Sequence, residues 1–349
     1  LLERPDGSLL LVGNIDDVHG TTPALLQVTA DGEPDPDFGT DGVRMVSVSF
    51  QWDWVRVYAA ALQSDGKVLL AGTCIGCLSE GGVDTFVARF GTSGAADPAF
   101  GTNGWVVFNA DELGDGPSEA HAVAIDSANR IVLGGSSNTG AQLRPYVARR
   151  LANGSPDPNF AGANGISTLV DVAEQYVTAL AVDPVHKTIV VATGDSSSAF
   201  PASAGVARLT NAGTLDATFS GDGVYPLTLE EGTYFSQVLL QSDEKIVAVG
   251  TINANGTQTA GFLLARFRTN GTLDPTFDGN GLKRIEFDLE TDGRDYATAA
   301  TLTGGRIVAV GGATSNGGTA SQIALLRTQS TLVFRDNFER ANRTAWDGN

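Results

Sequence analysis

A unit of about sixty residues is repeated six times along this chain. Each copy contains an apolar hairpin segment that ends in glycine, such as LQSDGKVLLAG and LQSDEKIVAVG. The closing glycines are Gly13, Gly72, Gly134, Gly194, Gly250 and Gly311, and they lie 56 to 62 residues apart. Because self-similarity at a fixed period of this length is typical of propellers and solenoids, the repeat constrains the fold more than any other feature.

A second motif lies between the hairpin segments, with the forms TSGAADPAFGTNGW and TNGTLDPTFDGNGL in two of its copies. Its aspartates are Asp35, Asp97, Asp157, Asp216 and Asp274. An arginine stands eight residues before the aspartate in four copies (Arg89, Arg149, Arg208 and Arg266), and Gln27 stands there in the first copy. We predict structural hydrogen-bonded pairs. Metal binding is the alternative, but one carboxylate per loop is too few for a calcium cage.

Each repeat predicts four short strands. In the second copy, VYAAALQ and VLLAG flank the turn SDGK, and DTFVARF and GWVVF follow. No stretch shows a sustained 3.6-residue apolar period, so we expect almost no helix. The motif phenylalanines are expected to plug the spaces between neighbouring repeats; they are Phe38, Phe100, Phe160, Phe219 and Phe277.

These strands predict an all-β fold, a six-bladed β-propeller of four-stranded antiparallel blades that fills residues 1–335. The expected blades are residues 1–49, 50–108, 109–170, 171–229, 230–287 and 288–335. Residues 336–349 leave the repeat and form a C-terminal tail, which we interpret as the start of a further module or as a sorting tail. A seventh blade lost by trimming and a linear solenoid are the alternative architectures.

The repeats resemble the delta-60 repeat of bacterial proteins. The resemblance is carried by LQSDGKVLLAG, FVARF and TNGTLDPTFDGNGL with their sister copies, and it covers roughly residues 1–335. It implies a β-propeller in a secreted or surface protein and brings no general activity with it. Two copies depart from the pattern, because the fourth has VDPVHK in place of the DG turn and the sixth lacks the DPxFG motif.

The charge balance restricts the partners of the chain. The formal net charge is -18, with 40 acidic residues against 22 lysines and arginines. Nucleic acid is therefore an unexpected partner, since phosphate binding needs clustered basic residues. No run of 18 apolar residues occurs, so we expect no membrane insertion. Abundant Gly, Thr and Ala with scarce Lys favour a secreted bacterial protein or one at the cell surface.

The only two cysteines lie in the segment TCIGC, at Cys74 and Cys77. Zinc would need two further ligands, a c-type haem would need a histidine after Cys77, and a thioredoxin-like site would need a βαβ context. A local disulfide is therefore the preferred interpretation, with two free thiols as the alternative.

Candidate ligand-binding residues lie outside the repeated motifs. In the loop QWDWVR, Trp52, Asp53 and Trp54 suit a sugar platform, because aromatic faces with a polar handle fit such ligands; alternatively, one tryptophan caps the blade beneath it. The starts of the first strands carry further polar and aromatic candidates. They are Arg56, Tyr58, Glu119, His121, Tyr176, Tyr234, Asp295 and Tyr296.

Two function classes remain open. The first is a secreted or surface binding module for a glycan, peptide or protein, without chemistry of its own. The second is a carbohydrate-active hydrolase or lyase, in which Glu119 with His121, and Asp295, would supply acid–base chemistry. No cofactor is expected, apart from a calcium ion for which Asp111, Glu112 and Asp115 are the candidate ligands. The balance of these observations favours a protein that is not an enzyme.

Overall fold

The computed structural model describes residues 1–17, 20–46, 54–78, 81–110, 116–138, 143–169, 172, 176–194, 204–229, 232–253, 260–287, 294–314 and 321–328. Within these residues every regular element is a β-strand. The chain divides into two compact units. The first comprises Leu1–Ser197 with Ala204–Pro226, and the second comprises Ser198–Ser203 with Leu227–Asn349. No helix in the described part of the chain is long and apolar enough to cross a membrane.

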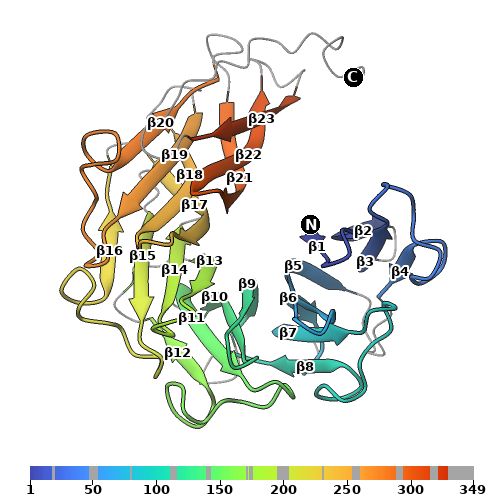
Figure 1. Cartoon of the computed structure of the whole chain (residues 1–349). Helices are drawn as coiled ribbons and strands as arrows, with labels where there is room; N and C mark the ends of the chain where they lie inside the picture. Colours follow the sequence, from blue (N-terminus) through green and yellow to red (C-terminus); the bar gives the residue numbers. More distant parts are fainter. Residues whose placement is uncertain are drawn as a thin grey trace, which may run out of the picture. The chain divides into compact units, whose positions relative to one another are not determined.

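The first unit contains four antiparallel groups of four strands, and in each group every strand pairs with the next one along the chain (Figure 1). The first two blades are β1 (Leu2–Glu3), β2 (Leu9–Asp17), β3 (Gly20–Val28) and β4 (Val43–Met45), then β5 (Val55–Leu62), β6 (Val68–Ile75), β7 (Val83–Phe90) and β8 (Trp105–Phe108). The next two are β9 (Ser118–Ile125), β10 (Ile131–Asn138), β11 (Leu143–Arg150) and β12 (Ile166–Thr168), then β13 (Tyr176–Val182), β14 (Ile189–Gly194), β15 (Ala204–Leu209) and β16 (Val224–Leu227). An all-β propeller of four-stranded antiparallel blades is therefore confirmed.

The second unit continues the same strand order but does not separate into two blades. Its strands are β17 (Gly232–Leu240), β18 (Ile246–Asn253), β19 (Ala260–Phe267), β20 (Leu282–Ile285), β21 (Arg294–Thr303), β22 (Arg306–Thr314) and β23 (Ser321–Arg327). A parallel contact between Ala260 and Arg294 joins β19 to β21, so these strands form one continuous sheet. Six separate four-stranded blades, as the sequence predicted, are thus not supported: the structure has four, followed by this joined sheet.

The turn between the first two strands explains why the repeat tolerates substitution there. The carbonyl oxygen of the first turn residue accepts a bond from the backbone N–H of the fourth, as Gln63 O does from Gly66 N at 2.9 Å, and Gly66 has a positive φ of 82°. In the fourth repeat, where VDPVHK replaces the DG turn, Lys187 takes the positive φ, at 58°. A non-glycine residue in this conformation costs some strain but keeps the hairpin.

The arginine–aspartate pairs are confirmed, and they hold the connection between the third and fourth strands. Arginine Nε lies 2.7–2.9 Å from aspartate Oδ2 in the pairs Arg89–Asp97, Arg149–Asp157, Arg208–Asp216 and Arg266–Asp274. In the first repeat, Gln27 Nε2 donates to Asp35 Oδ2 at 2.6 Å instead. Each arginine also stacks on the motif phenylalanine, as Arg149 does on Phe160 at 4.6 Å from the ring centroid.

Three of the motif phenylalanines, Phe38, Phe100 and Phe160, act between blades, as predicted. Phe100 is fully buried, and a Cβ added at Gly154 of the next blade would come within 3.0 Å of its ring. Phe38 faces Gly94 and Phe160 faces Gly213 in the same way. A backbone bond accompanies the packing, from Gly101 N to Asn153 O at 3.1 Å. Successive blades of the first unit therefore interlock at this motif, while their cores are the buried central strands such as β6, β10 and β14.

Candidate functional site

Each first strand from the second repeat onward contains a β-bulge at the same place. The register shifts by one residue in β5, β9, β13, β17 and β21. The extra residues are Tyr58, His121, Thr178, Ser236 and Thr298. A bulge bends the strand and changes the direction of its side chains. It therefore orients the candidate side chains at the start of each first strand.

The repeated glycine of the second strand exists because of this bulge. A Cβ added at Gly135 would overlap the carbonyl oxygen of Glu119, and Gly72, Gly250 and Gly311 face a carbonyl in the same way. The sequence analysis therefore placed the residue opposite the bulge one position too early or too late in two repeats. The third repeat uses Gly135 rather than Gly134, and the fourth has Thr193 opposite Val177 where glycine was expected.

Three aromatic rings from successive blades form a row at the starts of β5, β9 and β13. The rings of Tyr58 and His121 have centroids 4.7 Å apart, and those of His121 and Tyr176 lie 5.4 Å apart, edge to face. Glu119 Oε2 lies 3.3 Å from His121 Nε2. The Tyr58 residue is 41% exposed, so the row is open to a ligand. The structure thus brings together Tyr58, Glu119, His121 and Tyr176, which the sequence named separately.

The surroundings of Tyr58 keep its phenol in the neutral form. Partial burial, and then the nearby Glu119 carboxylate, raise the pKa of Tyr58 above its ordinary value. The Tyr58 hydroxyl therefore stays protonated at neutral pH and can donate a hydrogen bond. Together with the Glu119 carboxylate, it gives the aromatic row both a donor and an acceptor.

A second cluster borders this row and contains a residue that the sequence analysis missed. Arg56 Nη2 lies 3.2 Å from Asp16 Oδ1, and the Arg56 guanidinium carbon lies 5.5 Å from the Trp54 ring centroid. A hydrogen bond from Thr21 lowers the pKa of Asp16, so this residue is ionised at neutral pH. Asp16 belongs to β2, forty residues before Arg56. Only the pairing of the first two blades reveals the contact.

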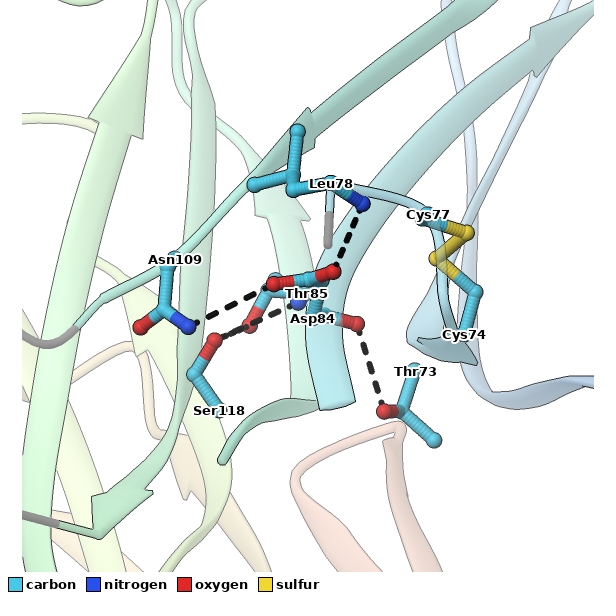
Figure 2. The surroundings of a disulfide bond; sticks show 8 residues. All are labelled: Thr73, Cys74, Cys77, Leu78, Asp84, Thr85, Asn109 and Ser118. Carbon is cyan, nitrogen blue, oxygen red and sulfur yellow. Dashed lines mark hydrogen bonds between the residues drawn. A yellow bond between two sulfur atoms is a disulfide. The ribbon is translucent and has the colours of Figure 1, made fainter. Parts of the chain in front are cut away.

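The disulfide loop supports the same edge of the second blade. Cys74 and Cys77 are bonded to each other, and Ile75 N donates to Trp54 O at 3.1 Å. Figure 2 shows that Leu78, just after the disulfide, is held by the Asp84 carboxylate. Asp84 is 2% exposed and also accepts a bond from Asn109 Nδ2 at 3.4 Å. The loop that follows β6 is thereby tied to the segment that leads into β9.

A buried hydroxyl network positions the start of β9. Thr85 N donates to Ser118 Oγ at 3.3 Å, and the Thr85 hydroxyl lies 3.0 Å from Ser118 Oγ (Figure 2). The same hydroxyl lies 3.0 Å from Tyr146 Oη. Ser118 precedes Glu119, so the network holds the candidate carboxylate in place. The sequence carried a signal for it: Tyr146 stands where other copies have Phe86 and Phe262, and a buried tyrosine needs a partner for its hydroxyl.

The remaining described candidates belong to the second unit. Tyr234 and Tyr296 are 36% and 43% exposed, and burial raises the pKa of Tyr234. Asp295 is 4% exposed, and its Oδ2 accepts a bond from Phe287 N at 2.7 Å. Asp295 therefore anchors the backbone beside β20, a structural role that the sequence analysis did not assign.

Several predicted residues lie outside the described part of the chain. They are Trp52, Asp53, Asp111, Glu112, Asp115 and the tail 336–349. Among the described residues, no group of three or more acidic, histidine or cysteine side chains could hold a metal ion. Calcium binding by Asp111, Glu112 and Asp115 stays a prediction.

Comparison with known families gives a β-propeller repeat. Four segments match the family described as "Domain of unknown function (DUF5122) beta-propeller": residues 4–38, 63–100, 129–160 and 241–277. These segments fall in the first, second, third and fifth repeats, so the fourth and sixth repeats, which depart from the motif, are not among them. The resemblance seen in the sequence is confirmed at this level, as a β-propeller repeat family. No curated protein matches the chain.

Solved structures similar to the chain include Sqt1 from Chaetomium thermophilum, at 15% identity and a TM-score of 0.47, covering 87% of this chain and 64% of that one. The chain thus spans under two thirds of the length of that protein. A glucose dehydrogenase matches at 11% identity and a TM-score of 0.48, covering 87% and 93% of the two chains. An endo-arabinase from Bacteroides thetaiotaomicron matches at 10% identity and a TM-score of 0.38, covering 80% and 95%.

Proposed function

We propose that this chain is a secreted or cell-surface binding module that recognises a glycan at the aromatic row of Tyr58, His121 and Tyr176. The observation that carries the proposal is the spacing of the rings, at 4.7 and 5.4 Å, in a partly exposed position beside Glu119. Sugar rings stack on aromatic faces, and their hydroxyls bond to carboxylates and phenols. A peptide or protein ligand is the other outcome of the same binding test.

The proposal extends to the architecture. We take the six repeats as one six-bladed propeller of the delta-60 type, supported by the order β17–β20, which repeats that of the four blades in the first unit. Such repeats give a rigid frame, and the residues presented by that frame carry recognition.

A glycan array followed by calorimetry on the best saccharide tests the binding function. Tyr58→Ala and Tyr176→Ala should each weaken binding by about tenfold or more, since stacked aromatic residues carry a large share of such affinities. Val185→Ala is the matched control, because Val185 is 75% exposed in the turn at the far end of the fourth blade. Saccharide binding that survives both tyrosine changes would place recognition elsewhere.

A carbohydrate-active hydrolase or lyase is the second candidate, favoured by the contact of 3.3 Å between Glu119 and His121. A carboxylate beside an imidazole is suited to proton transfer. Incubation of the array's best saccharide with the chain, followed by product analysis, separates the two functions. Cleavage that disappears in Glu119→Gln would establish that the chain is an enzyme. A saccharide that stays intact would favour the binding function.

A further inference from the structure

An accessible carboxylate lies beside the middle ring of the aromatic row formed by Tyr58, His121 and Tyr176. It belongs to Glu119, two residues before His121 on β9, and the Glu119 side chain is 31% exposed. Within the described part of the chain, the ionic contact of Glu119 is with His121 Nε2, at 3.3 Å, and no lysine or arginine pairs with it. An imidazole compensates a carboxylate only when the imidazole is protonated. A ligand at the row therefore meets a carboxylate next to aromatic rings.

The arginine at this end of β5 is already paired with another carboxylate. Arg56 Nη2 lies 3.2 Å from Asp16 Oδ1 and 3.5 Å from Asp16 Oδ2. Partial burial and then the Glu119 carboxylate raise the pKa of Tyr58, and Arg56 opposes them with a smaller effect. Two carboxylates and one guanidinium thus leave a negative charge in excess here, and the whole chain has a formal net charge of -18. Both the local and the overall charge favour a positively charged ligand.

The rings of the row offer faces in more than one direction. The planes of Tyr58 and His121 are tilted by 37°, and those of His121 and Tyr176 are perpendicular, at 90°. A cation is attracted to the face of an aromatic ring within about 6 Å of the ring centroid. Since neighbouring centroids are 4.7 and 5.4 Å apart, one ammonium group beside the row can lie within this range of two rings. The geometry therefore suits a cation as well as a sugar ring.

We infer that the saccharide bound at the row carries a protonated amine, as glucosamine units do, and that this amine lies between the Glu119 carboxylate and the Tyr58 ring. The inference rests on the proposed glycan-binding function and adds the charge of the ligand to it. The ammonium group donates hydrogen bonds to the carboxylate and is attracted to the ring face, while the sugar ring stacks on the rest of the row. N-Acetylation of the amine removes the charge and with it both contributions. Uronic acids are disfavoured, because their carboxylate would face Glu119.

Calorimetric titrations with a glucosamine trimer and an N-acetylglucosamine trimer test the inference, in slightly acidic, low-salt buffer that keeps the sugar amines protonated. The glucosamine trimer should bind about tenfold more tightly or better. High salt should reduce this preference, because the Debye length falls to about 3 Å at 1 M. If the titrations and the glycan array find binding only of saccharides without a free amine, the inference is wrong and the proposed binding function stands. If no saccharide binds, both are wrong.

Variants assign the preference to its residue. Glu119→Gln removes the charge at nearly constant size, so the ratio of the two trimer affinities should fall toward one. Glu33→Gln is the matched control, because it removes the same charge from an exposed position between β3 and β4 and should keep the ratio. An unchanged ratio in Glu119→Gln, or an equal fall in Glu33→Gln, contradicts the inference.

His121→Phe addresses the competing imidazole. This variant keeps a ring in the row but cannot take up a proton, so the affinity ratio should be at least that of the unmodified chain. A smaller ratio would show that the ammonium group faces His121 rather than Glu119. Circular dichroism checks that each variant is folded. Should Glu119→Gln not fold, the trimer comparison and its salt dependence in the unmodified chain decide.

Discussion

Two regions of each repeat differ in what recurs. One is the connection between the third and fourth strands, and the other is the start of the first strand. At the connection, side chains recur: Arg149 bonds to Asp157 at 2.7 Å and to Asn211 O at 2.7 Å, and other copies keep the arginine–aspartate distance within 0.2 Å. At the first strand, the bulge recurs but its residue is Tyr58, His121, Thr178, Ser236 or Thr298. Side chains that build the fold are therefore the same from repeat to repeat. Where the backbone alone builds the fold, as at the bulge, the side chains differ between repeats and are available for recognition.

Removing a buried arginine should have the largest effect on this comparison. Arg149→Leu leaves Asp157, which is 1% exposed, without its principal cation, and breaking such a pair costs about 3–5 kcal/mol. The urea midpoint of unfolding measures the loss, with Arg44→Leu on the exposed β4 as control. A loss no larger than the control's would mean that the pair is not what stabilises the connection.

Acid should weaken the same connection through its aspartates. Burial tends to raise the pKa of Asp274, but hydrogen bonds from Thr276 and the charges of Arg266 and Lys245 bring the pKa to about 2. The unfolded value is about 4, so the stabilisation is complete above that pH and is lost as pH falls toward 2; it amounts to about 2–3 kcal/mol.

Melting temperatures measured between about pH 5 and pH 2 check this pH dependence. Asp274→Asn should be less stable at neutral pH, with a shallower decline in acid, because it removes the group that takes up the proton. Asp222→Asn is the control, since Asp222 is exposed and accepts the backbone N–H of Val224. Equal slopes for the unmodified chain and Asp274→Asn would refute the assignment.

A methyl group opposite the bulge should have a smaller effect. Gly135→Ala places a Cβ against the Glu119 carbonyl, so β9 must move, at a cost of about 1–3 kcal/mol. The shift should also reduce ligand binding at the aromatic row, because Glu119 and His121 move with the strand. Gly13→Ala is the matched control, since nothing lies within 4 Å of the added Cβ there. Equal urea midpoints for the two variants would remove the steric account of the repeated glycine.

The smallest effect is expected for the surface pair. Arg56→Gln removes a salt bridge to Asp16, whose side chain is 65% exposed, so the urea midpoint should change less than it does in Gly135→Ala. Glycan affinity should fall more than stability if Arg56 contacts the ligand. A fall in the urea midpoint as large as that of Gly135→Ala would show that the first-strand end also supports the fold.

The sequence predicts much of the fold because its strongest signals are local. The spacing of eight residues between Arg149 and Asp157 lies within one strand and its following turn, so the salt bridge follows from pattern alone. The hairpin turns are equally local. The junction of β19 with β21 through Ala260 and Arg294 is not, and no periodicity predicts whether neighbouring repeats stay separate.

The candidate site was harder to predict for the same physical reason. Tyr58, Glu119, His121 and Tyr176 were named from alignment, but their proximity depends on how three blades pack. Asp16 carried no signal, because its partner Arg56 is in another blade. The confusion of Gly134 with Gly135 arose because both are glycine, and only the path of the Glu119 carbonyl distinguishes them.

Phe38, Phe100 and Phe160 each pack against a glycine of the following blade, and this packing gives the synthesis of the chain a direction. When Phe100 leaves the ribosome, the glycine that covers it, Gly154, has not yet been made. At typical elongation rates of about 5–20 residues per second, that delay is on the order of 3 to 10 seconds. A newly made blade therefore exposes its motif phenylalanine until the next blade covers it. Slow translation of one repeat prolongs this exposure and makes aggregation through the preceding blade easier.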